Sequence, residues 1–132
     1  MLFRRLVVAA TVVAAAQCPI PSVAARTVDR LVVTVADNPE GVQTYTLECH
    51  PAGGSHPGPA RACDRLDATT ADGDPFAPVP AGARCTMIYG GPATARITGT
   101  WAGRPVDAGF KRTNGCEIAR WDNLVPALPG AR

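Results

Sequence analysis

Hydrophobic and polar side chains alternate in two early stretches of the chain. Residues 31–35 are mostly β-branched and apolar, and residues 43–49 place three apolar side chains on one face and polar ones on the other. Alternation with a period of two is typical of a half-buried β-strand. Because turn-forming residues occupy positions 37–41, the two stretches predict an antiparallel hairpin with a five-residue loop.

A second hairpin is predicted nearer the C-terminus. Residues 94–101 alternate strictly, with small or apolar side chains on one face and polar ones on the other. Residues 106–110 place apolar side chains at every second position, and Ala102 and Gly103 lie between the two stretches, where a turn is expected. The pattern therefore gives four strand-like segments in two pairs.

Two short helices complete the expected elements. Residues 59–66 begin with proline, contain good helix formers and lack β-branched side chains. Asn114 stands three residues before Glu117, which is the spacing of a reciprocal helix cap, so residues 114–121 predict the second helix. The intervening residues 68–84 are rich in Asp, Gly, Pro and Ala and are interpreted as a long loop. The chain after residue 124 carries two prolines and is expected to trail, so the overall prediction is an α+β fold.

Residues 1–25 have the features of a secretory signal peptide. A basic start is followed by an apolar run of eleven residues, Leu6–Ala16, and then by prolines and small residues. The run is too short to span a membrane. Lipid attachment at Cys18 is the alternative, but Gln17 is bulky at a position where a small residue is needed. We therefore expect cleavage after Ala25 and one extracellular domain, residues 26–132.

Charge argues against two classes of partner. The whole chain has a net charge of +2. Loss of Arg4 and Arg5 with the signal peptide leaves equal numbers of basic and acidic side chains. Because no basic patch is left, neither nucleic acid nor a membrane surface is an expected partner.

The cysteines predict two disulfides. Removal of Cys18 leaves an even number, which in an exported chain is typical of a disulfide framework: Cys49, Cys63, Cys85 and Cys116. Spacing alone allows three pairings. The stretch between the first two cysteines is rich in Pro and Gly and brings its ends together, so local stereochemistry favours Cys49 with Cys63 and leaves Cys85 with Cys116.

Candidate metal ligands are better explained as loop residues. His50 and His56 lie between Cys49 and Cys63, but secreted cysteine pairs oxidise, and neither histidine has a usual zinc spacing. Four aspartates follow, interrupted by other residues and without the spacing of a calcium loop: Asp64, Asp67, Asp72 and Asp74. Motifs of nucleophilic, phosphate-binding or metalloprotease sites are absent from the sequence. We expect no enzyme activity, no metal and no cofactor.

The segment Arg84-Cys85-Thr86-Met87-Ile88-Tyr89 carries the functional hypothesis. It lies between Pro- and Gly-rich turns, and Cys116, after Asn114 and Gly115, is available to tie it down. A segment anchored in this way is held extended and exposed, so that it presents a substrate-like bond to a protease. The alternative is that Met87 belongs to a strand and fills space in the core.

Five motifs occur in order with nearly matching gaps: residues 46–57 (Thr-Leu-Glu-Cys-His-Pro-Ala-Gly-Gly-Ser-His-Pro), 62–66 (Ala-Cys-Asp-Arg-Leu), 85–89 (Cys-Thr-Met-Ile-Tyr), 99–106 (Gly-Thr-Trp-Ala-Gly-Arg-Pro-Val) and 114–117 (Asn-Gly-Cys-Glu). Together they resemble the Streptomyces-type subtilisin inhibitor family. The resemblance covers nearly all of residues 26–132.

The resemblance implies a fold and a mode of action. The fold would be a five-stranded antiparallel sheet with two short helices, two disulfides and an exposed protease-binding loop, in a homodimer that pairs through the sheet. The disulfides would again be Cys49–Cys63 and Cys85–Cys116. Met87 would enter the specificity pocket of a secreted subtilisin-like or chymotrypsin-like serine protease, with Met87–Ile88 as the reactive bond. Asn114 would support the loop from behind.

Three departures from the family pattern bear on the loop. Gly90-Gly91-Pro92 replaces a common Asp-Pro pair and is one residue longer, and Thr86 stands where proline is common. Arg84 stands where an apolar side chain would suit the deep outer pocket of subtilisin, so we expect reduced affinity for subtilisin. The rival hypothesis is a secreted scaffold or binding protein that kept the fold and lost inhibition.

Overall fold

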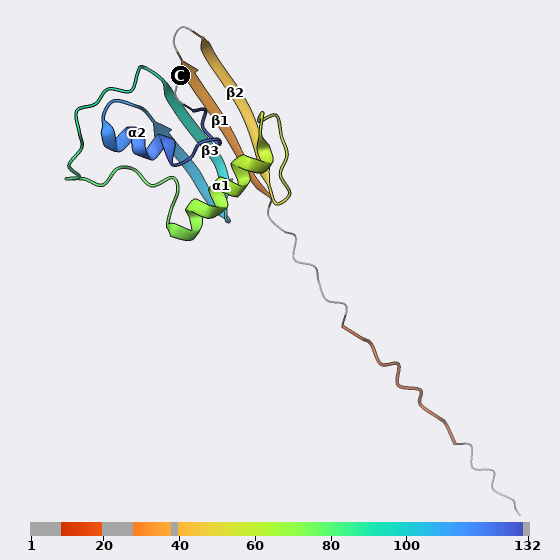
Figure 1. The fold of residues 1–132 in the computed structure, drawn as a ribbon. Coiled ribbons are helices and arrows are strands. Elements are labelled where there is room, and N and C mark those ends of the chain that lie inside the picture. Colours follow the sequence, from red (N-terminus) through yellow and green to blue (C-terminus); the bar gives the residue numbers. More distant parts are fainter. Residues whose placement is uncertain (1–8, 20–27, 38–39, 131–132) are drawn as a thin grey trace, which may run out of the picture.

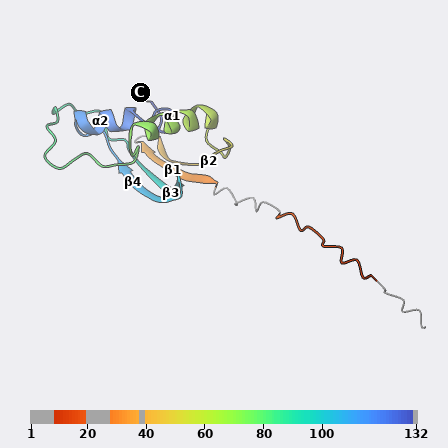
Figure 2. The ribbon, with the colours of Figure 1, turned by 90° about the horizontal axis from the view of Figure 1, so that it is seen from below.

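The computed structural model describes residues 9–19, 28–37 and 40–130. Within them, the domain has two layers, an antiparallel sheet and two helices that lie on one of its faces (Figures 1 and 2). The elements, in chain order, are β1 (Asp29–Asp37), β2 (Gly41–Cys49), α1 (Pro59–Asp72), β3 (Thr94–Trp101), β4 (Arg104–Phe110) and α2 (Gly115–Asp122). Neither helix is long and apolar enough to cross a bilayer. The expected cleavage site after Ala25 lies outside the described residues.

Both predicted hairpins are present. The sheet order is β2-β1-β3-β4, so the first strand of each hairpin is central and the second lies at an edge. In the second hairpin, Trp101 pairs with Arg104 across Ala102 and Gly103, which have φ values of 50° and 75°. In the first, Asp37 pairs with Gly41, and part of the turn lies outside the described residues.

The expectation of a fifth strand is wrong for the described part of the chain, where the sheet has four strands. After β2 the backbone turns back and pairs at one residue, with two hydrogen bonds of 2.9 Å between Glu48 and Gly53. Regular pairing is interrupted at Gly54, which has a φ of 94° and where a Cβ would lie 2.4 Å from the Thr46 carbonyl oxygen. Beyond it, the N–H of His56 donates to the carbonyl of Thr46 at 2.9 Å, but the segment does not form a strand. Alternation along the chain supported only four strands, and the fifth came from the family resemblance alone.

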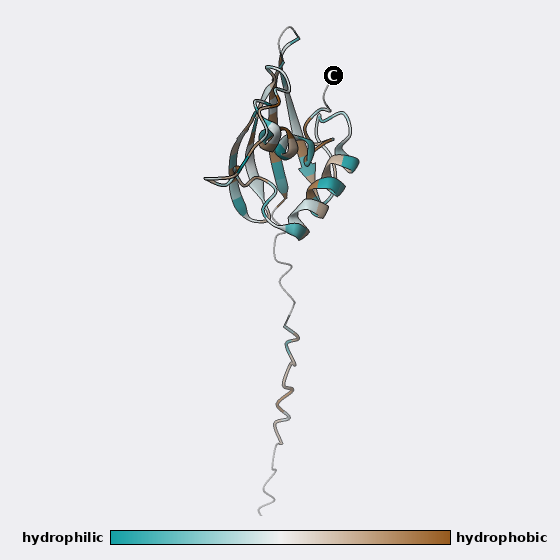
Figure 3. Ribbon diagram, turned by 60° about the vertical axis from the view of Figure 1, so that its left-hand side comes forward, coloured by the Kyte–Doolittle hydropathy of each residue, from teal (hydrophilic) through white to brown (hydrophobic). Residues whose placement is uncertain are grey.

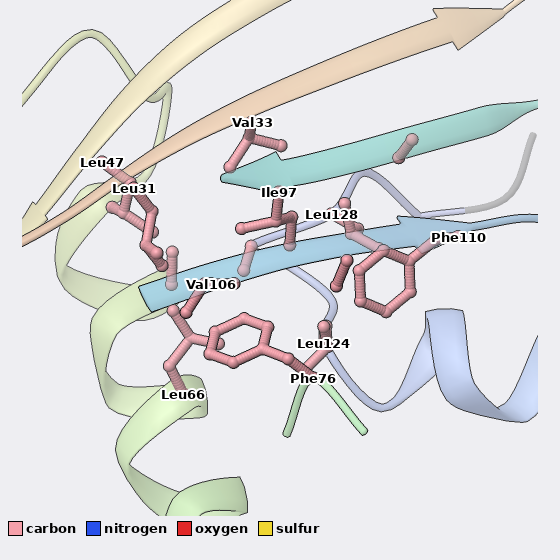
Figure 4. Close-up of a cluster of buried hydrophobic side chains, with 14 of the residues drawn as sticks. Leu31, Val33, Leu47, Leu66, Phe76, Ile97, Val106, Phe110, Leu124 and Leu128 are labelled. Carbon is pink, nitrogen blue, oxygen red and sulfur yellow. The ribbon is translucent and has the colours of Figure 1, made fainter. Parts of the chain in front are cut away.

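The hydrophobic core lies between the sheet and the helices. Side chains from the sheet, from α1 and from the segment after α2 converge there (Figure 4). Hydrophobic and hydrophilic residues both occur along the helices and strands (Figure 3), as expected for elements with one buried side. Fully buried side chains include Leu31, Val33, Leu47, Leu66, Ile97, Trp121, Leu124 and Leu128.

The expectation that the chain trails after residue 124 is wrong. Leu124, Ala127 and Leu128 are buried in the core. The indole N–H of Trp121 donates to the carbonyl of Pro129 at 2.8 Å. α2 ends at Asp122, and the segment after it stays on the domain because its apolar side chains are buried in the core.

The first helix is longer than predicted, so the following loop is shorter. α1 continues through Thr69 and Thr70, whose hydroxyl groups donate to the carbonyl of Leu66 within the helix. These β-branched residues weaken the helical signal in the sequence. The helix ends at Gly73, which has a φ of 146°.

His50 links three elements at one end of the sheet. Its Nδ1 lies 2.6 Å from Asp29 Oδ2 at the start of β1, and its Nε2 lies 2.9 Å from Asp67 Oδ2 in α1. The hydrogen bond to Asp67, and then that to Asp29, raise the pKa of His50 above its ordinary value of 6.5. Asp29 also accepts a 2.8 Å hydrogen bond from the backbone N–H of Ala102. This histidine therefore links β1, α1 and the β3–β4 turn.

Candidate functional site

The loop between α1 and β3 carries three consecutive exposed large apolar side chains, and one of them, Met87, is the most exposed in the described part of the domain. Residues 83–91 form neither helix nor strand, and the loop projects beyond α2 (Figures 1 and 2). Met87 is 92% exposed, Ile88 61% and Tyr89 65%. Arg84 and Thr86 are also exposed, whereas Cys85 is partly buried. Met87 is therefore not part of the core.

The leading half of this loop is fastened to the start of α2. Cys85 and Cys116 form a disulfide with 5.2 Å between their Cα atoms, and Cys49 and Cys63 form the other predicted disulfide. The backbone N–H of Gly115 donates to the carbonyl of Thr86 at 2.9 Å. The first amides of a helix have no partner within the helix, so this donor is available to the loop.

Gly115 is a site of close approach between α2 and the loop. A Cβ atom at this position would lie 1.9 Å from Oγ1 of Thr86 and 3.3 Å from its Cβ. Glycine is a poor helix former, so its use at the first position of α2 is explained by this contact. With Thr86 in its present conformation, the loop lies this close to the helix because residue 115 has no side chain.

The trailing half of the loop is fastened at Gly90. Its N–H donates to the carbonyl of Arg112 at 2.7 Å, and its carbonyl accepts from Nε of Arg112 at 3.2 Å. A Cβ at Gly90 would lie 2.9 Å from two carbon atoms of the Ile118 side chain. Gly91 has a φ of 100°, which lets the chain turn toward β3. The extra glycine relative to the family pattern therefore belongs to a fixed part of the loop.

Asn114 acts at the start of α2. Its side-chain oxygen accepts the N–H of Glu117 at 3.0 Å, as the predicted cap requires. The contacts with the loop come from the next two residues, Gly115 and Cys116. Support of the loop by Asn114 therefore remains a prediction, and the geometry favours an indirect role through the position of the helix.

The chemistry of the loop is that of a binding surface. Three exposed apolar side chains follow one another on a backbone that is tied at both sides. The only ionisable side chains among residues 83–91 are those of Arg84 and Tyr89, so the loop itself offers no pair of acid and base groups. Exposed apolar clusters of this kind mark sites of protein–protein contact.

Three residues of the site were not predicted from the sequence. Gly115 had a detectable signal, since a glycine directly after a helix cap suggests close backbone approach. Gly90 was noted only as part of an unusual Gly-Gly pair. Arg112 had no local signal, because its contacts with the loop depend on the path of the chain between β4 and α2.

The chain is similar in sequence to known proteins. The family model described as subtilisin inhibitor-like matches residues 25–114. Subtilisin inhibitor-like protein 1 of Streptomyces cacaoi is 39% identical over 91 residues, which cover 65% of this chain and 79% of that protein. The subtilase-type protease inhibitor of Streptomyces fradiae is 37% identical over 93 residues, which cover 66% of this chain and 63% of that protein.

Among solved structures, one similar chain is Streptomyces caespitosus sermetstatin, crystallised in complex with Bacillus licheniformis subtilisin. It is 31% identical, with a TM-score of 0.49, over 77% of this chain and the whole of that one. The match of the family model to most of the domain is the decisive finding. This chain belongs to the subtilisin inhibitor-like family.

Proposed function

We propose that the protein is a secreted inhibitor of subtilisin-like serine proteases that binds through residues 84–89, with Met87–Ile88 as its reactive bond. The family is one of protease inhibitors rather than enzymes. The observation that carries the proposal is the 92% exposure of Met87 on a loop whose backbone is tied on both sides to the domain.

The binding mode follows from the shape of the loop. An extended segment adds to a protease cleft as a strand, so that main-chain hydrogen bonds give affinity and side-chain pockets give specificity. Because the disulfide and the contacts at Thr86 and Gly90 order the loop beforehand, little conformational entropy is lost on binding. Burial of Met87 in an apolar pocket contributes about 2–3 kcal/mol.

Arg84 sets a preference at the outer part of the cleft. It lies three residues before Met87 and is exposed, and the segment from Pro75 to Val106 contains no carboxylate. An arginine gains little in an apolar outer pocket, because its charged group loses water without a partner. The preferred proteases therefore carry an acidic or open outer pocket, and affinity for subtilisin itself is reduced.

A homodimer through the open face of the sheet fits the distribution of side chains there. The central strands place the half-buried, uncharged Val32, Thr34 and Thr98 on this face. Ion pairs between Arg30 and Glu48 and between Arg96 and Asp107 flank them. An uncharged centre with a charged rim is typical of protein interfaces. Val32→Arg should convert a dimer to a monomer in light scattering after size-exclusion chromatography.

Titration of residues 26–132 against subtilisin and trypsin tests the proposal. A stoichiometric loss of subtilisin activity, with weak action on trypsin, is expected, because Met87 cannot pair with the carboxylate of the trypsin pocket. No loss of protease activity at micromolar protein would favour a secreted binding protein that has lost inhibition. Export itself is tested by expression of the full chain in a secreting host, with the first residue of the released protein expected at position 26.

A further inference from the structure

We propose that Arg112 is a positioning residue that holds the second half of the reactive loop in place once the bond is cut. The inference rests on the proposed function, since it concerns the same loop. The inference adds to the proposed function by assigning the retention of the Ile88 side of the bond to a residue outside the loop, through its backbone and its side chain.

Arg112 contacts one loop residue by two routes. Its backbone carbonyl accepts the N–H of Gly90 at 2.7 Å, and its Nε donates to the carbonyl of Gly90 at 3.2 Å. Both polar groups of Gly90 are therefore satisfied by a single residue of the domain. Ile118 closes the remaining side, where a Cβ at Gly90 would lie 2.9 Å from its side chain.

Arg112 is itself held rigidly. The residue is 6% exposed, and its Nη1 donates to Asp122 Oδ1 at 2.8 Å in α2. Its guanidinium lies 5.5 Å from the centre of the Trp121 ring, which is buried in the core. A buried arginine whose Nε and Nη1 both have acceptors has few alternative positions, so its contact with Gly90 is a fixed point for the loop.

The position of this fixed point relative to the reactive bond matters. When Met87–Ile88 is cut, the Met87 side is held by the disulfide at Cys85, two residues before the bond. The Ile88 side has no disulfide and is held by Arg112 at Gly90, two residues after the bond. The two anchors are therefore symmetrical about the bond, one covalent and one made of hydrogen bonds.

Retention of Ile88 favours closure of the bond over release. In the acyl-enzyme, the Met87 carbonyl carbon is esterified to the serine oxygen of the protease. The free amine of Ile88 attacks that carbon, the C–N bond forms, the ester C–O bond breaks, and the proton from the amine passes through the base of the protease to the serine oxygen. Water competes for the same carbon. Hydrolysis becomes faster relative to closure of the bond when the Ile88 end moves away.

Arg112→Lys and Arg112→Met test this role, because both lose the N–H at Nε. Arg112→Lys keeps a positive charge beside Asp122 and Trp121 and therefore keeps the test informative even when Arg112→Met does not fold. Asp122→Asn is the matched control, since it removes the negative charge, keeps an amide oxygen that can accept from Nη1 of Arg112, and leaves the two contacts with Gly90. Each protein, as residues 26–132, is incubated with subtilisin, and intact and cleaved forms are quantified by mass spectrometry.

The expected result is a change in hydrolysis rather than in initial binding. For the folded Arg112 variants, the equilibrium ratio of cleaved to intact inhibitor and the rate of hydrolysis at saturation should rise about tenfold, which corresponds to about 1.4 kcal/mol. The early inhibition constant should change less than about threefold, because the intact loop is still closed covalently. Asp122→Asn should resemble the wild type.

Failure of the Arg112 proposal and failure of the proposed function would give different results. If folded Arg112→Lys is hydrolysed as slowly as the wild type, with the same equilibrium ratio, the side chain of Arg112 does not position the loop and the proposal is wrong. If the wild type neither inhibits subtilisin nor is cut at Met87–Ile88, the proposed function itself is wrong.

Discussion

Replacement of Gly115 by alanine should weaken inhibition far more than it weakens the fold. The new Cβ would lie 1.9 Å from Oγ1 of Thr86, and real Cβ atoms essentially never approach other atoms within 3.0 Å. Either the Thr86 side chain turns away or the loop moves off the helix by about 1 Å, because the packed domain beneath cannot yield. Either change disturbs the residue next to Met87.

The magnitude can be worked out from these contacts. A strained side-chain rotamer at Thr86 costs about 0.5–1.5 kcal/mol, and a weakened hydrogen bond from Gly115 to Thr86 costs about 1 kcal/mol. The free variant relieves this cost by moving Thr86 and the loop, whereas the complex requires the original loop position, so a total of about 2 kcal/mol falls on binding and corresponds to an inhibition constant about 30-fold weaker. Alanine is also a better helix former by about 1 kcal/mol. The free energy of unfolding should therefore change by no more than about 1 kcal/mol.

A double-mutant cycle with Thr86→Ala provides the assay. Inhibition constants against subtilisin and midpoints of thermal unfolding are measured for the wild type, both single variants and the double variant. Removal of Oγ1 leaves the Thr86 Cβ at 3.3 Å, a contact that small shifts accommodate, so the double variant should regain most of the lost inhibition. A Gly115→Ala protein that inhibits as tightly as the wild type, or a double variant no better than Gly115→Ala, would refute the reasoning.

Three further predictions address specificity, durability and pH. Met87→Lys should transfer preference to trypsin, measured by inhibition constants against trypsin and subtilisin, and an unchanged preference would contradict the assignment of Met87. Cys85→Ser/Cys116→Ser should bind at first but be hydrolysed at Met87–Ile88 within hours, and a variant as durable as the wild type would show that the disulfide does not hold the loop. Because the folded-state pKa of His50 is raised, its stabilisation is fully present below about pH 6.5 and is lost as the pH rises through the folded pKa. The thermal unfolding midpoint of the wild type should therefore fall, as the pH is raised through the folded pKa of His50, by more than the midpoint of His50→Gln falls. Equal pH profiles of the two proteins would contradict this.

The strands were predictable because apolar and polar side chains must alternate along a half-buried strand, and this alternation is visible in the local sequence. Residues 94–101 alternate and form β3 with the predicted bounds, since one face packs in the core and the other faces solvent. The C-terminal segment obeys no such local rule. Leu124, Ala127 and Leu128 are buried because the space beside Trp121 must be filled, and the neighbouring prolines conceal that need in the sequence.

The candidate loop was predictable in position but not in construction. Cys85 and Met87 could be identified from cysteine spacing and family resemblance, although Cys-Thr-Met-Ile-Tyr also fits a strand. The contacts of Gly90 with Arg112 and of Thr86 with Gly115 join segments more than 20 residues apart. No periodicity or local propensity encodes contacts of that separation, so only the folded chain reveals them.

The most direct test of the reactive bond is the site at which a protease cuts the intact protein. Residues 26–132 are incubated for days with a small amount of subtilisin, and the product is analysed before and after reduction. We expect one slow cleavage that adds the mass of one water, with the two pieces joined by the Cys85–Cys116 disulfide and a single new N-terminus at Ile88. A new N-terminus elsewhere in the loop, or rapid degradation to small peptides, would contradict it.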